Sequence, residues 1–229
     1  MTTTTSLRLR FLADPAEFLT VAGRRLEAEP VVSTVVASVT ERLVRQREAG
    51  SAVLSHLWWV VAEDAGEVVG VGMRTARTAP YPVFLLPQPE EAALLLARTL
   101  HERGEEVVAV NGALPTAQTF AEETARLAGG RVEVAQHTRL HELGELVEPR
   151  PVPGRLVPVG EPDLGLAREW VEAFMGDADE QAGRPRGASG HEVPEEPEML
   201  RRIRAGEWWF WRDADGTPVH LTCHGATAF

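Results

Sequence analysis

Two stretches of the chain share an alternation of apolar and polar positions that is typical of a β-hairpin. In "WWVVAEDAGEVVGVGM" (58–73) two apolar runs flank an acidic turn with glycine, and "WWFWRDADGTPVHLTC" (208–223) repeats the arrangement. Aromatic and β-branched runs joined by such a turn favour paired antiparallel strands. Without a gap, the Trp58–Trp59 doublet aligns with Trp208–Trp209 at an offset of 150 positions. The pattern therefore predicts one hairpin in two places.

The residues before each hairpin repeat as well. "RLRFLADPAEFL" (8–19) aligns with "RLVPVGEPDLGL" (155–166), and each stretch has a short strand pattern followed by an acidic residue and proline. Proline is favourable in the first turn of a helix. A second amphipathic helix follows in each stretch and ends in Ala-Gly, a common helix stop, at 49–50 and 205–206. The order strand, helix, helix, strand, strand is thus predicted twice, which indicates an internal duplication.

The first copy continues beyond its hairpin. The pattern predicts a strand over 81–86, a helix over 88–104, a buried strand over 105–112, a helix over 114–130 and a final strand region over 131–143. The proline-rich stretch 148–155 predicts a linker, so we expect one domain over 1–149 and a second over 150–229. By the alignment, the second copy holds only the first half of the repeated unit.

This order of elements resembles the GCN5-related N-acetyltransferase (GNAT) family, in the tandem form typical of actinobacteria. The resemblance is carried by 110–127 with Asn111 in copy one, and by 154–174 and 206–229 in copy two. It implies an α/β (α+β) fold with a mixed, mostly antiparallel sheet flanked by helices, duplicated and with the second copy half present. It also implies transfer of an acetyl group from acetyl-CoA, as co-substrate, to a small-molecule or peptide amine.

The family's pyrophosphate loop, Arg/Gln-x-x-Gly-x-Gly/Ala, corresponds in copy one to "LPQPEEAA" (86–93), which has no glycine. Pro87 and Pro89 lack the N–H groups that such a loop offers to phosphates, and Glu90 and Glu91 repel them. We therefore expect copy one to be degenerate and non-catalytic. The cofactor loop of copy two is expected beyond residue 229, so that this chain alone is inactive. A non-catalytic GNAT-like binding or scaffolding module stays open as the alternative, and no general base is identified.

The polar, acidic segment 175–198 joins the first two predicted helices of copy two. The resemblance places it at the wall that binds the acceptor, where Asp177, Asp179 and Glu180 are predicted to attract an amine. The alternative is a surface loop without a binding role.

Other conspicuous side chains favour structural roles. His220, Cys223 and His224 do not have a standard zinc-site spacing, so no metal is expected. Cys223 is expected to be a small core residue, and the paired tryptophans are expected to pack in the core.

Composition narrows the partners. The chain has 229 residues, is 44% hydrophobic and carries a formal net charge of -11, which disfavours nucleic acid. All 23 basic residues are arginine, which excludes lysine chemistry such as a Schiff base. No stretch reaches the roughly 20 apolar residues of a membrane span, and a cytoplasmic location is expected. A half-copy leaves a sheet edge that a homo-oligomer would cover.

Overall fold

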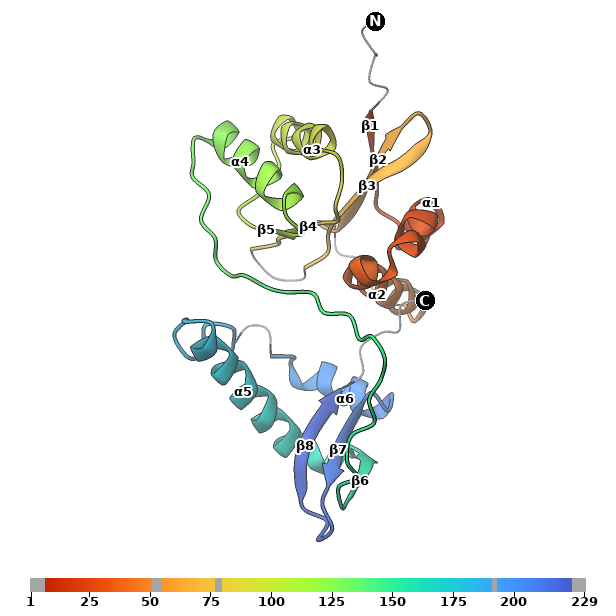
Figure 1. Ribbon diagram of the computed structural model, residues 1–229, viewed down its shortest axis with the longest axis vertical. Coiled ribbons are helices and arrows are strands. Elements are labelled where there is room, and N and C mark those ends of the chain that lie inside the picture. The colour runs from red at the N-terminus through yellow and green to blue at the C-terminus, as the bar shows by residue number, and fades with distance from the viewer. Residues whose placement is uncertain (1–6, 51–54, 77–79, 191–192, 224–229) are drawn as a thin grey trace, which may run out of the picture. The chain divides into compact units, whose positions relative to one another are not determined.

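The computed structural model describes residues 7–50, 55–76, 80–190 and 193–223, and the chain divides into two compact units (Figure 1). Unit 1 lies within 7–142 and unit 2 within 143–223. The expected domain boundary after residue 149 falls, like this division, inside the stretch 131–153, which contains no helix or strand.

Unit 1 is built around a five-stranded sheet in the order β1-β2-β3-β4-β5. Neighbouring strands are antiparallel except β4 and β5, which are parallel. The sheet is therefore mixed and mostly antiparallel, as the resemblance implies. Its elements are β1 (Arg8–Leu12), α1 (Pro15–Ala28), α2 (Pro30–Glu48), β2 (Trp58–Asp64), β3 (Glu67–Arg74), β4 (Val83–Leu85), α3 (Glu90–Glu102), β5 (Val110–Gly112) and α4 (Thr116–Ala128).

Helices cover both faces of the unit 1 sheet, with α1 and α2 on one side and α3 and α4 on the other (Figure 1). Successive strand residues point to opposite faces, so the neighbours Trp58 and Trp59 enter different cores. Trp59 packs with Phe18 beneath α1 and α2, whereas Trp58 packs with Leu96 beneath α3. The predicted core role of both tryptophans is confirmed.

Unit 2 has a three-stranded antiparallel sheet in the order β6-β7-β8 with two helices (Figure 1). Its core contains Val159, Met199, Trp208 and Phe210, packed against residues of both helices. Trp208 is buried, as the sequence predicts, whereas Trp209 is half-buried and is not part of this core, so the expected core role fails for the second tryptophan of the pair. The elements are β6 (Arg155–Pro158), the short 3-10 helix η1 (Glu161–Asp163), α5 (Leu164–Gln181), α6 (Glu196–Arg204), β7 (Trp208–Arg212) and β8 (Pro218–Cys223).

The strand pairings show that the two units repeat one register, with a correction to the ungapped alignment. Offsets of 147 for β1, 149 for β2 and 150 for β3 relate every pairing of the unit 2 sheet to a pairing in unit 1. The irregularity after Ala62 likewise falls after Trp211. Trp59 is thus equivalent to Trp208 and not to Trp209. The extra residue lies in the longer turn between β7 and β8.

Two predicted strands differ from the structure. Residues 131–143 form no strand, and their apolar side chains are exposed, Val134 by 65%. The predicted buried strand over 105–112 shortens to β5, whose residues are half-buried or exposed. A strand needs the backbone groups of a neighbour, and β4 offers only three residues to β5. The apolar pattern alone therefore overestimated both strands.

Candidate functional site

The connection from β4 to α3 is the place where the resemblance locates a cofactor. The Leu86 N–H donates to the Val71 carbonyl at 3.0 Å, which extends the pairing of β4 with β3 by one residue. The chain then passes through Pro87, Gln88 and Pro89 and starts α3 at Glu90. We refer to residues 86–89 as the β4–α3 loop.

The groups around this loop do not fit the pyrophosphate of acetyl-CoA. Pro87 and Pro89 have no N–H to donate, and the Gln88 N–H is already donated to the Thr116 Oγ1 at 3.1 Å. The amino end of a helix attracts anions, but Glu90 and Glu91 place two exposed carboxylates in the first turn of α3. A phosphate would meet like charge here and few free donors.

Other elements hold the loop from outside. The Arg25 guanidinium, on α1, donates from Nη2 to the Pro87 carbonyl at 3.1 Å. Thr116, at the start of α4, is buried and also donates from its hydroxyl to the Gln88 carbonyl at 3.3 Å. The loop is therefore connected to α1 and α4 by its backbone groups.

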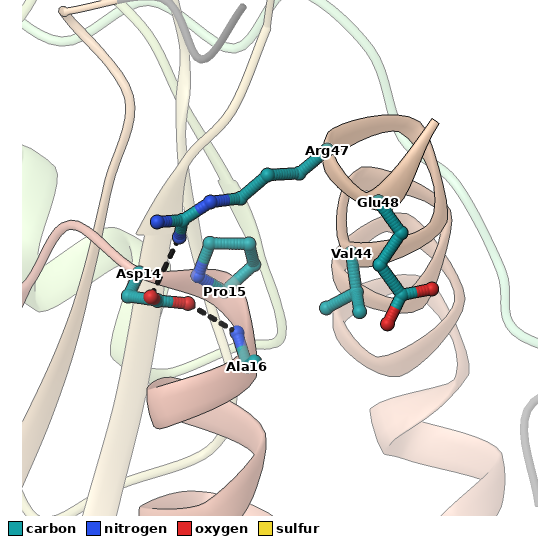
Figure 2. A pocket seen from close by; sticks show the side chains of 6 residues that line it. All are labelled: Asp14, Pro15, Ala16, Val44, Arg47 and Glu48. Atoms are coloured by element: carbon teal, nitrogen blue, oxygen red, sulfur yellow. Dashed lines mark hydrogen bonds and ion pairs between the residues drawn. The ribbon is translucent and has the colours of Figure 1, made fainter. Parts of the chain in front are cut away.

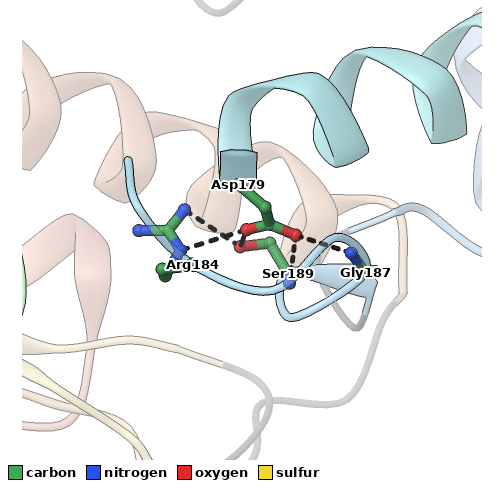
Figure 3. Close-up of polar contacts among 4 residues, drawn as sticks. All are labelled: Asp179, Arg184, Gly187 and Ser189. Atoms are coloured by element: carbon green, nitrogen blue, oxygen red, sulfur yellow. Dashed lines mark hydrogen bonds and ion pairs between the residues drawn. The ribbon is translucent and has the colours of Figure 1, made fainter. Parts of the chain in front are cut away.

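The predicted acceptor residues lie on the last turns of α5, because this helix continues to Gln181 where the sequence suggested a loop. Asp179 is fully buried, and Figure 3 shows its carboxylate surrounded by four donors. The Ser189 N–H and hydroxyl donate at 3.0 and 2.7 Å, the Gly187 N–H at 3.0 Å and Arg184 Nε at 3.0 Å. These bonds, those from Ser189 first, lower the pKa of Asp179 to about 2. The ionised carboxylate of Asp179 thus holds the turn 182–190 in place. Its oxygens are already used as hydrogen-bond acceptors within the fold.

Asp177 and Glu180 are exposed to solvent and share one partner. Arg186 Nη1 lies 2.7 Å from Asp177 and 3.3 Å from Glu180. The guanidinium offsets part of the negative charge that an amine would meet. Their role in binding an amine stays a prediction.

A surface hollow of about 320 Å³ lies between the start of α1 and the end of α2 (Figure 2). Asp14 caps α1 by accepting from the Ala16 N–H at 2.9 Å, and its second oxygen lies 2.6 Å from Arg47 Nη1. The bond from Ala16, together with Arg47, lowers the pKa of Asp14. Asp14 and Arg47, two of the three charged residues that line the hollow, are thus used by the fold. The third is Glu48, and the remaining residues around the hollow are Pro15, Ala16 and Val44.

One cluster of ionisable and aromatic groups in unit 1 was not found from the sequence. The His56 ring lies 4.5 Å from the ring of Tyr81, the single tyrosine, and Arg74 lies 5.7 Å from that ring. Glu105 accepts from Trp58 Nε1 at 2.8 Å and pairs with Arg74 at 3.4 Å. These residues come from four separate segments, so no local motif marks them. Their mutual pairing indicates a structural polar cluster.

Within the described ranges, no group of three or more His, Cys, Asp or Glu is placed to hold a metal ion. His220 is exposed, and His224 lies outside the described residues. Cys223 is exposed, so the expectation of a core cysteine is wrong. Cys223 is the last residue of β8, an edge strand of the sheet, where it pairs with Trp208 of β7. None of the helices described here is long and apolar enough to cross a bilayer.

Comparisons with known proteins add little to this geometry. No protein-family model matches the chain, and no curated protein matches it. Among solved structures, an aminoglycoside N-acetyltransferase in complex with CoA matches 66% of this chain and 99% of its own, with 15% identity and a TM-score of 0.31. A TM-score this low carries no inference about activity.

Proposed function

We propose that this protein is an N-acetyltransferase of the GNAT type, which transfers an acetyl group from acetyl-CoA to an amine, and that unit 1 is its non-catalytic domain. The order of elements in unit 1 supports the first part, since α3 joins β4 to a parallel β5 as the resemblance implies. The shared register supports the view that unit 2 begins as a second copy of the same fold.

The observation that carries the non-catalytic role of unit 1 is the chemistry of the β4–α3 loop. Two prolines, a backbone N–H already bonded to Thr116 and two carboxylates replace the donors that a pyrophosphate requires. The proposal therefore assigns acetyl-CoA to residues other than this loop. It assigns no catalytic step to a residue of unit 1.

A second candidate function, a GNAT-like binding or scaffolding module without acyl transfer, is favoured by the same loop. The fold itself does not decide between the two functions.

An acetylation assay separates the two candidates. Thiol release from acetyl-CoA is followed with a panel of primary amines, using the wild-type protein and the double variant Glu90→Gln/Glu91→Gln. Acyl transfer by this chain predicts that an amine accelerates release, with the same KM for acetyl-CoA in both proteins. No release with any amine contradicts acyl transfer by this chain and agrees both with the expected inactivity of the chain alone and with the binding module. A changed KM in the double variant contradicts the non-catalytic role of unit 1.

A further inference from the structure

The side chain of Gln88, in the β4–α3 loop, lies against Gly70 of β3. Gly70 of β3 has no Cβ, and a Cβ added there would collide with Gln88 Oε1 and lie 3.0 Å from its Cβ and Cδ. The Gln88 side chain thus lies directly on the backbone of β3. Only glycine at position 70 leaves room for this contact.

Hydrogen bonds fix the backbone of the same residue. Its N–H donates to Thr116 Oγ1 at 3.1 Å, and its carbonyl accepts from that hydroxyl at 3.3 Å. Thr116 is 3% exposed, so this pair is shielded from water. Gln88 is therefore held by β3 through its side chain and by α4 through its backbone.

The amide of Gln88 does not explain why a glutamine stands there. Its Nε2 is buried, and among the described residues it has no hydrogen-bond partner. An unpartnered buried donor opposes folding, so the shape of the side chain and not its amide group holds it in place.

We propose that Gln88 seals the β4–α3 loop, which means that its own side chain occupies the position where a cofactor would bind. Through its contacts, Gln88 also links β3 with α3 and α4. The seal rests on the proposed function only in taking this loop as the cofactor position. The loop is then held rigidly between β3, α3 and α4 of unit 1, and we refer to this arrangement as the joint. Removal of its charge alone is not expected to open it for acetyl-CoA.

The test measures amide hydrogen exchange over residues 86–93 in the full chain. Gln88→Met keeps the length of the side chain and removes the unpartnered amide, so exchange is expected to stay at the wild-type rate or slow. Gln88→Gly removes the filling, and exchange is expected to become about tenfold faster, the order of a lost local contact. Equal rates in Gln88→Gly and the wild type would overturn the seal, and so would fast exchange in Gln88→Met.

Thr116 provides a matched pair of variants. Thr116→Val removes the hydroxyl that binds Gln88 and is expected to speed exchange over 86–93. Thr124, on the same helix, has a buried hydroxyl without a partner among the described residues, so Thr124→Val is expected to leave this exchange unchanged. The same effect from both variants would contradict the joint. Since the exchange measurement requires no amine or acetyl-CoA, it can refute the seal while the proposed function holds. Equally, the acetylation assay can refute the proposed function while the seal holds.

Discussion

Unit 1 and unit 2 share strand register but differ in how their sheets are covered. In unit 1, helices bury both faces, so that Val60 is 2% exposed. In the described part of unit 2, α5 and α6 pack on one face, and the other face leaves Leu156 51% exposed and Trp209 half-buried. The register of the hairpin is therefore set by its own strands and by the two helices before it. The second helical layer of unit 1 is not needed for that register.

The largest expected effect concerns the tryptophans that this comparison makes equivalent. Trp59→Ala and Trp208→Ala each remove a buried ring and are expected to destabilise their own unit by about 3–5 kcal/mol. Trp209→Ala is expected to cost about 1 kcal/mol, since its side chain is half-buried. Amide exchange in β2 and β7 under increasing urea measures each unit separately. A loss of stability in Trp209→Ala as large as in Trp59→Ala would support the ungapped alignment, which pairs Trp59 with Trp209. It would contradict the corrected alignment, which pairs Trp59 with Trp208.

A smaller effect on stability is expected when acid protonates two buried carboxylates, Glu123 in unit 1 and Asp179 in unit 2. Side-chain bonds from Arg126 and Arg98 lower the pKa of Glu123 to about 2, and Asp179 has a pKa lowered to the same region. Because the folded-state pKa is below the ordinary value, the stabilisation is complete above about pH 4.5 for Glu123 and pH 3.8 for Asp179. It is lost as the pH falls toward 2.

Amide exchange between pH 5 and pH 2 tests these two groups. Exchange in 182–190 is expected to quicken below about pH 4, beyond its intrinsic pH dependence, as Asp179 becomes protonated. Asp179→Asn is expected to remove that extra dependence in unit 2 and leave unit 1 unchanged. Glu123→Gln is expected to do the reverse for α3 and α4. An unchanged acid response in both variants would show that these carboxylates do not hold the two units as described.

The smallest expected effect is at Cys223. Its side chain is exposed, so Cys223→Ser is expected to change the free energy of unfolding by less than about 0.5 kcal/mol. In the native protein its thiol is expected to react with a colorimetric disulfide reagent without denaturant. A thiol that reacts only after unfolding would show that Cys223 is buried in the native protein.

Local chemistry explains what the sequence predicted well. The hairpins follow from apolar runs around glycine turns, and the start of α1 follows from Asp14 and Pro15. The sequence also predicts that the β4–α3 loop does not fit a phosphate, because proline lacks a backbone N–H and glutamate carries a negative charge.

Non-local contacts explain what the sequence did not predict. The ungapped alignment matches both tryptophans of each doublet, whereas the strand pairing, which the sequence does not show, makes Trp59 equivalent to Trp208. Residues 131–143 alternate like a strand but have no strand partner in the described structure. The role of Asp179 depends on the turn that brings Ser189 back to the end of α5. The contact of Gln88 with Gly70 joins two segments that no motif connects.

Titration of the chain with acetyl-CoA, followed by amide exchange over residues 86–93, tests most directly whether unit 1 has the fold without the cofactor site. The account predicts no protection of these amides across about 1 μM to 1 mM, the range in which enzymes commonly use their substrates. Calorimetric heat without such protection would place binding elsewhere in the protein. Saturable protection of residues 86–93 would contradict the account.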